Sequence, residues 1–142
     1  MRKKRTNGVN PFDKEKYPNV HRGHEYALKV VNKEIAYCIY VYGSCKRYLE
    51  DLKTNNRWYF NPEPAEKYLR LVQKFPHVKG KWPTPNIVYA DWQCFAFMCI
   101  MGFISYETGE RRFRTAHVEV PRGNGKGAMA SQAALFFLAL DN

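Results

Sequence analysis

A short glycine-rich segment near the end of the sequence carries the residue types that phosphate binding requires. Residues 121–127 read PRGNGKG. Glycines allow a backbone to curl until consecutive N–H groups face one oxygen-rich group. Lys126 would add a full positive charge where the outer phosphates of a nucleotide lie. The segment therefore predicts a phosphate-binding turn.

Two regular elements must position this turn. Residues 112–120 alternate loosely between polar and apolar side chains and include β-branched residues, which predicts a strand that ends at Val120. Residues 128–140 are rich in alanine and leucine, which predicts a helix with small side chains for close packing on a sheet. The N-terminus of this helix would add unsatisfied N–H donors and a partial positive charge to the turn.

The turn matches the phosphate-loop pattern G-x-x-x-x-G-K-[ST] at two of its four fixed positions. Gly125 and Lys126 fit the pattern, whereas Val120 stands in place of the first glycine. Gly127 stands in place of the serine or threonine whose hydroxyl helps to hold Mg²⁺. A glycine-rich turn between a strand and a helix, with no ligand, is the alternative interpretation of the local pattern.

The charge balance favours a polyanionic partner. The 142 residues include 23 Lys and Arg and 13 Asp and Glu, which gives a net charge of +10. Half of this excess lies in residues 1–22, which we interpret as a flexible arm that is either solvated or in contact with phosphates. A second basic group lies in the predicted strand, where the alternative is a solvated strand face. The candidate DNA-contacting residues are Arg2, Lys3, Lys4, Arg5, Arg111, Arg112 and Arg114.

The composition also excludes several classes of protein. Hydrophobic residues make up 45% and aromatic residues 15% of the chain, which argues against intrinsic disorder. No apolar run is long enough for a transmembrane helix, and no apolar stretch follows the basic start as it would in a secretory signal. The four cysteines have no C-x-x-C spacing, so we expect reduced thiols and no metal site.

The part of the chain before the predicted phosphate-binding turn is expected to be mainly helical. In residues 24–54 the apolar side chains recur at spacings of three and four, which predicts one amphipathic helix. The sequence NPE at residues 61–63 predicts the start of a second helix. Residues 76–88 hold three prolines and one glycine and are expected to form a loop, which is the best internal boundary. Residues 90–106 are nearly all apolar and predict a buried helix.

In order and spacing, these motifs resemble the large terminase subunit of tailed bacteriophages, in its HK97-like branch. The resemblance covers roughly residues 80–142. It rests on four matches. The sequence DWQ at 91–93 resembles the family's Pro-Trp-Gln signature, and Phe103 with the turn at 107–110 resembles its Gly-Trp and turn segment. Residues 111–120 resemble its basic strand, and residues 121–126 resemble its variant Walker A loop.

The resemblance implies an ATP-driven motor that packages viral DNA into a procapsid. Such proteins have an N-terminal P-loop ATPase domain and a C-terminal nuclease domain of the RNase H type. The resemblance implies ATP and Mg²⁺ as cofactors, and double-stranded DNA, the portal protein and the small terminase subunit as partners. It also implies a homo-oligomer in the intact motor, and a location in the host cytoplasm at the procapsid portal.

The family's site residues can be carried onto matching positions of this sequence. Lys126 would contact the β and γ phosphates, and Gln93 would correspond to the glutamine near the adenine. Gly123 replaces the usual lysine of the variant loop, and Gly127 replaces the hydroxyl residue, so the sequence departs from the pattern at the position that places Mg²⁺. The implied nucleotide-binding residues are Gln93, Arg122, Gly123, Asn124, Gly125, Lys126 and Gly127.

We therefore expect an α/β fold, namely a truncated P-loop NTPase with one strand, the phosphate loop and one helix, preceded by a mainly helical segment. The expected organisation is a flexible basic arm at 1–22, a helical segment at 23–79 and the incomplete start of a terminase ATPase domain at 80–142. Because no Walker B strand follows the helix, we expect a terminase fragment without ATP turnover. The alternatives are a non-enzymatic basic module with a degenerate P-loop, which binds DNA or another phage protein, and a different P-loop NTPase.

Overall fold

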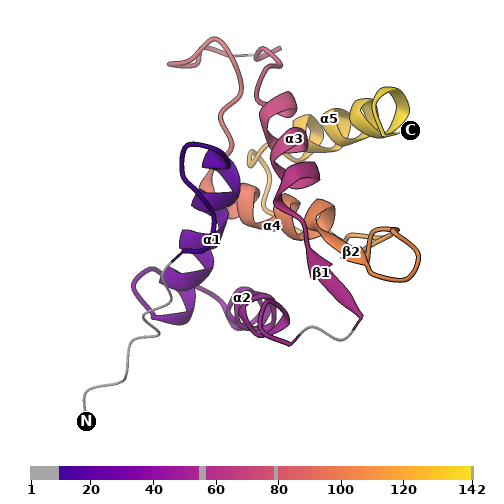
Figure 1. Cartoon of the computed structure of the whole chain (residues 1–142). Coiled ribbons are helices and arrows are strands. Elements are labelled where there is room, and N and C mark those ends of the chain that lie inside the picture. The colour runs from indigo at the N-terminus through magenta and orange to yellow at the C-terminus, as the bar shows by residue number, and fades with distance from the viewer. Residues whose placement is uncertain (1–9, 55–56, 79, 142) are drawn as a thin grey trace.

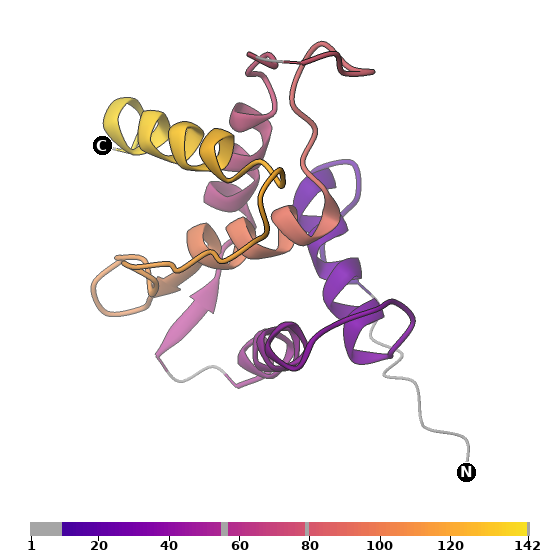
Figure 2. The same ribbon diagram turned by 180° about the vertical axis from the view of Figure 1, so that it is seen from behind.

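Helix α4 (Asp91–Gly102) lies at the centre of the structure, and helices α1 and α3 pack directly against it (Figures 1 and 2). The computed structural model describes residues 10–54, 57–78 and 80–141. Within these residues helices combine with one small sheet, so the fold is broadly α/β, as expected. The elements follow in the order α1 (Pro18–Val31), α2 (Ile39–Asp51), β1 (Trp58–Phe60), α3 (Pro62–Val72), α4, β2 (Phe103–Ser105) and α5 (Lys126–Ala139).

The apolar sequence of α4 explains its central position. Its buried side chains include Phe95, Phe97 and Met98, so the prediction of a buried helix is confirmed. The helix ends at Gly102 rather than near residue 106, because the chain there turns into strand β2. In the described part of the chain, no helix has both the length and the apolar character needed to cross a membrane.

Helix α3 begins where its local signals place it. The side chain of Asn61 accepts a hydrogen bond from the backbone N–H of Glu63 at 3.0 Å, and Pro62 occupies the first helical position. The prediction of a helix start at residues 61–63 is therefore confirmed.

The prediction of one helix over residues 24–54 is wrong, because the chain leaves the helical conformation after α1. Lys33 adopts a left-handed conformation with φ of 63°. Its N–H donates to the carbonyl of Val30, and the N–H of Glu34 donates to the carbonyl of Lys29. This is the hydrogen-bond pattern of a Schellman cap, which usually has glycine where Lys33 stands. Helix α2 then starts separately at Ile39.

The expected arm boundary at residue 22 also differs from the structure, because helix α1 already begins at Pro18. Residues 1–9 lie outside the described residues. The described residues before α1 are held against it, since the side-chain amide of Asn10 donates to the carbonyl of His21 at 3.1 Å. Phe12 packs against the rings of His24 and Phe60. Local packing of these side chains therefore replaces the expected flexible arm in this stretch.

A cluster of aromatic side chains joins the small sheet to the helices. Strands β1 and β2 pair antiparallel, with Phe60 opposite Phe103. Both rings pack edge-on against Tyr48 of α2, which also contacts Phe95 of α4. The sheet thereby closes one side of the core, and α2 covers it.

The prediction of a strand over residues 112–120 is wrong for the structure as described. The backbone pairs with β2 only through an isolated bridge between Ile104 and Arg111. Residues 113–120 make no backbone–backbone hydrogen bond to any described residue. The alternating side chains favour an extended chain, but a strand forms only when a neighbouring strand pairs with it.

Helix α5 packs mainly through one face, which lies against α3. Met129, Gln132 and Phe136 are buried in this contact. The side-chain amide of Gln132 donates to the carbonyl of Val72 at 3.1 Å, and its oxygen accepts from the Tyr89 hydroxyl at 2.8 Å. The opposite face is apolar and exposed, as at Leu138, which is 81% exposed.

A buried carboxylate on α3 caps the start of α1. The side chain of Glu66 is buried, and its oxygens accept hydrogen bonds from the backbone N–H groups of Asn19 and Val20, both at 3.0 Å. The side-chain amide of Asn19 and the guanidinium of Arg70 also donate to it, at 2.8 and 2.9 Å. These are N–H groups that the first turn of α1 leaves without helical partners. Glu66 therefore fixes α1 and α3 relative to each other.

A buried histidine should make the stability of the fold depend on pH. The Nδ1 atom of His24 lies 2.8 Å from the Tyr48 hydroxyl, and burial lowers the pKa of His24 from 6.5 to about 4. Between these two pH values the unfolded chain binds a proton at His24 that the folded chain does not. The contribution of His24 to the free energy of unfolding should therefore be constant well above pH 6.5 and fall towards pH 4, with a loss of about 2 kcal/mol by pH 5. Urea unfolding at pH 7.5 and pH 5 measures this difference.

The matched control for His24 is the exposed His117. Replacing His24 with glutamine should remove most of the pH dependence that this residue contributes, whereas His117→Gln should leave it unchanged. An equal pH dependence in wild type and His24→Gln would contradict the assignment.

Candidate phosphate-binding turn

The glycine-rich turn and the helix after it lie where the sequence places them. Gly123 and Gly125 have φ values of 89° and 75°, in the left-handed region that favours glycine. Gly125 is the N-cap of α5, and no side chain in the described part of the chain caps the first turn of this helix. Among the described residues, the N–H groups at the start of α5 are therefore free of side-chain acceptors, and they lie at an exposed turn.

Lys126 folds back over the turn. It is the first residue of α5, and its Nζ atom donates to the carbonyl oxygen of Val120 at 2.6 Å. Within the turn, the side-chain amide of Asn124 donates to the carbonyl of Pro121 at 3.3 Å. A full charge, two left-handed glycines and an uncapped helix start are brought together within a few residues.

Gln93 lies beside the same helix. Its side-chain oxygen accepts from the backbone N–H of Ala90 at 2.7 Å, which supports the start of α4. Its nitrogen lies 3.2 Å from the sulfur of Met129, in the first turn of α5. The structure therefore brings Gln93 close to the turn, although its amide is occupied by contacts within the protein. Arg122 is exposed in the turn.

The position expected to place Mg²⁺ offers no oxygen ligand from a side chain. Gly127 has none, and the hydroxyl of Ser131, one turn further on, donates to the carbonyl of Gly127 at 2.9 Å. Across the described ranges of the chain, no three His, Cys, Asp or Glu side chains gather in a group that could hold a metal ion. The residues present suit the phosphates of ATP, but they do not suit the metal.

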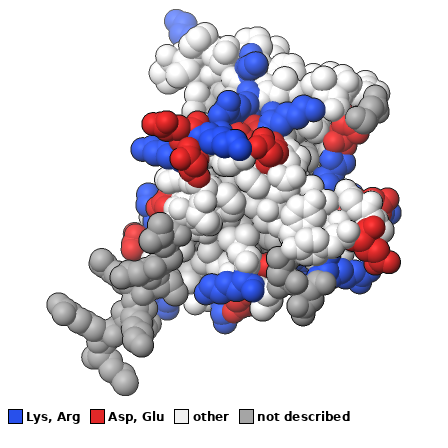
Figure 3. Space-filling model, in the orientation of Figure 1, with Lys and Arg blue, Asp and Glu red and all other residues white. Residues whose placement is uncertain are grey.

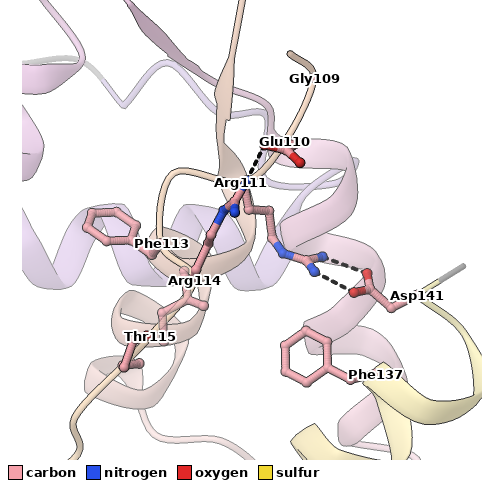
Figure 4. Close-up of a pocket in the computed structure, with 10 residues that line it drawn as sticks. Gly109, Glu110, Arg111, Phe113, Arg114, Thr115, Phe137 and Asp141 are labelled. Atoms are coloured by element: carbon pink, nitrogen blue, oxygen red, sulfur yellow. Dashed lines mark hydrogen bonds and ion pairs between the residues drawn. The ribbon is translucent and has the colours of Figure 1, made fainter.

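The three candidate DNA-contacting arginines of the described residues are paired with carboxylates. Arg111 forms a two-pronged ion pair with Asp141 across a cavity of about 560 Å³ and lies over the ring of Phe137 (Figure 4). Asp141 raises the pKa of Arg111. The remaining pairs are Arg112 with Asp51 at 2.8 Å and Arg114 with Glu110.

These ion pairs give the arginines a structural role. Arg111 connects the turn after β2 to the end of α5, and Arg112 connects the same region to α2. These partners have no local signal in the sequence, because the pairs of Arg111 and Arg112 are 30 and 61 residues apart in the chain. A contact of these arginines with DNA stays a prediction. The candidates Arg2, Lys3, Lys4 and Arg5 lie outside the described residues.

Comparison of the chain with protein-family models, with curated proteins and with solved structures finds no match.

Proposed function

We propose that residues 121–127 bind the phosphate groups of ATP and that the chain is the N-terminal ATPase portion of a viral DNA-packaging terminase large subunit. The ordered set of motifs that resembles this family supports the proposal, together with the arrangement of the turn around Lys126. In this role, the turn would bind the ATP whose hydrolysis by the intact motor drives DNA into procapsids at the portal, in the host cytoplasm. Double-stranded DNA, the portal protein, the small terminase subunit and further copies of the chain are the proposed partners.

The position of the Lys126 ammonium carries the proposal. It lies 2.6 Å from a neutral carbonyl at an exposed turn. Hydrogen bonds between two charged groups are stronger than those to a neutral acceptor, so a phosphate oxygen would replace the carbonyl of Val120. The uncapped N–H groups at the start of α5 would donate to the same phosphate.

Binding without hydrolysis is the activity proposed for these residues. Gly127 supplies no hydroxyl to hold Mg²⁺ against the phosphates, and Ser131 uses its hydroxyl within the helix. We therefore expect ATP to bind equally well with and without Mg²⁺, and we expect no ATP turnover by this chain.

Replacing Lys126 with alanine should remove most of the stabilisation by ATP. At about 100 times its Kd, a ligand that binds only the folded state adds about 2.7 kcal/mol to the free energy of unfolding. Wild type should gain this amount, because the ammonium and the N–H groups are already in place. Lys126→Ala should lose most of it, because only the backbone donors remain. Urea unfolding with and without ATP, in the absence of Mg²⁺, measures both values.

Lys46→Ala is the matched control, since Lys46 is an exposed lysine on α2 that pairs with Glu50. This variant should gain as much from ATP as wild type does. An ATP effect that is absent from wild type, or equal in wild type and Lys126→Ala, would overturn the proposal.

The second candidate is a non-enzymatic basic module whose phosphate turn has degenerated. The glycine at position 127 favours it, because this residue removes the hydroxyl that nucleotide hydrolysis needs. The same unfolding experiment separates the two functions: stabilisation by a DNA duplex, with none by ATP, would support the second.

A further inference from the structure

A proline-rich arm projects from the body between α3 and α4. We define the arm as residues 76–78 and 80–86. Its base is held like that of a hairpin, by a bridge between Pro76 and Asn86 and by a hydrogen bond from the Ile87 N–H to the carbonyl of Phe75 at 2.9 Å. Both ribbon views show the arm extending away from the helices (Figures 1 and 2). Most residues of the arm are exposed.

The arm holds one tryptophan in a fixed position. The ring of Trp82 stacks on that of His77, with 4.7 Å between the ring centres and 13° between the planes. Gly80 supports the edge of the indole, because a Cβ atom on this residue would lie 3.1 Å from the indole nitrogen. Gly80 also has a φ of 89°, a conformation that other residues rarely adopt. Trp82 is nevertheless 57% exposed, so much of its surface faces solvent.

The surroundings of this tryptophan are basic. From residue 67 to residue 90 the sequence contains no Asp or Glu. The described lysines nearest to the arm in the chain are Lys74 and Lys81, and both are exposed. In the space-filling view the arm, at the top, shows blue and white atoms, and the red atoms begin in the belt below it (Figure 3). On the face shown, a polyanion can therefore approach the arm without meeting a carboxylate.

We propose that the arm binds single-stranded nucleic acid. An unpaired base would stack on the exposed face of Trp82, and Lys74 and Lys81 would contact the neighbouring phosphates. Aromatic stacking of this kind tolerates every base, because each base has a π face. A duplex does not offer this contact, since the faces of its bases are covered by their neighbours. The arm is thus a binding site separate from the turn at Lys126, and it requires no nucleotide there.

The stacked His77 makes the site ready for a ligand. A side chain that is already held in place loses little conformational freedom on binding, so more of the contact free energy appears as affinity. Lys81 precedes the tryptophan directly, which keeps its charge near the phosphate of a stacked nucleotide.

Fluorescence anisotropy of a labelled oligothymidylate, titrated with the full chain, tests the proposal. Wild type should bind the single strand more tightly than a duplex of the same length. Trp82→Ala should weaken binding of the single strand about ten-fold, in line with the loss of one stacking contact. Trp82→Phe should restore part of the affinity, because a smaller ring still stacks. Replacing both Lys74 and Lys81 with glutamine should reduce the dependence of binding on salt.

Tyr40→Ala is the control for a general loss of exposed aromatic surface, since Tyr40 is exposed on α2. It should leave the affinity unchanged. Equal affinity of wild type and Trp82→Ala for the single strand would overturn the proposal, and so would equal affinity of the wild type for single strand and duplex. Binding to vesicles of anionic lipid that depends on Trp82, without binding to the oligonucleotide, would assign the arm to a membrane surface instead.

Discussion

Replacing Glu66 with alanine should destabilise the protein by about 4 kcal/mol, the largest effect expected from a single substitution here. The carboxylate is 4% exposed and accepts hydrogen bonds from Asn19, Val20 and Arg70. Without it, two N–H groups at the start of α1 lose their acceptor, one of them fully buried at Val20. The attraction between a negative charge and the start of a helix is lost as well. Urea unfolding followed by circular dichroism at pH 7 measures the change.

Glu66→Gln should have a smaller effect than Glu66→Ala, because the amide keeps one oxygen acceptor and the shape of the side chain. Glu50→Ala is the matched control: its carboxylate is exposed on α2 and lies 3.8 Å from Lys46. Exposed pairs of this kind contribute less than about 1 kcal/mol. If Glu66→Ala and Glu50→Ala destabilised the protein equally, the capping role of Glu66 would be wrong.

Replacing Gly23 with alanine should destabilise the protein by about 3 kcal/mol. Gly23 lies where α1 crosses α4, and a Cβ atom there would lie 2.7 Å from the sulfur of Met98 and 2.9 Å from the backbone nitrogen of Phe95. The sulfur can move, but the backbone of α4 cannot do so without separating the two helices. Because α4 is the centre of the core, this separation should also weaken its contacts with α3. Urea unfolding of the variant measures the loss.

Gly43→Ala provides a control of opposite sign. Gly43 is a helical residue of α2, and a Cβ atom there would meet nothing within 4 Å. Alanine is favoured over glycine in a helix, so this substitution should stabilise the protein by about 1 kcal/mol. A stabilising effect at both positions would show that α1 and α4 do not approach as closely as the structure describes.

The elements that could be predicted from the sequence are those whose signals are local. Asn61 and Pro62 define the start of α3 within two residues, and the structure begins the helix there. The glycine at position 125 separates the turn from α5, and the apolar run of α4 has one stable location, in the core. In each case the information lies within one turn of the element that it determines.

The elements that could not be predicted depend on partners distant in the chain, or on backbone conformations that the residue type disfavours. Lys33 adopts a left-handed conformation although lysine rarely does so, and the break between α1 and α2 therefore carries no glycine signal. Residues 113–120 have the composition of a strand, but pairing depends on a neighbouring strand, whose position in the chain the local pattern does not indicate. An alternating pattern predicts an extended backbone more reliably than it predicts a sheet.

In the candidate site, too, local features could be predicted from the sequence and contacts between distant residues could not. The turn and Lys126 follow from a few consecutive residues. The contact of Gln93 with Met129 spans 36 residues, and it depends on how α4 and α5 pack. The carboxylate partner of Arg111 is likewise distant in the sequence, so a basic cluster in the sequence became a set of ion pairs in the structure.

The one-sided attachment of α5 has a consequence for any ligand at its first residue. Gln132 and Phe136 bury one face of the helix on the body while most of its other face is exposed, so detachment of the helix is a local opening expected near the turn. A detached helix would take Lys126 away from Gln93. It would also allow Gly123 and Gly125 to adopt more backbone conformations. Ligand affinity is then scaled by the fraction of molecules with the helix seated, and the ligand in turn raises that fraction. A substitution that strengthens the packing of α5 on the body, at a distance from the turn, would therefore increase the affinity for the ligand without changing a binding residue.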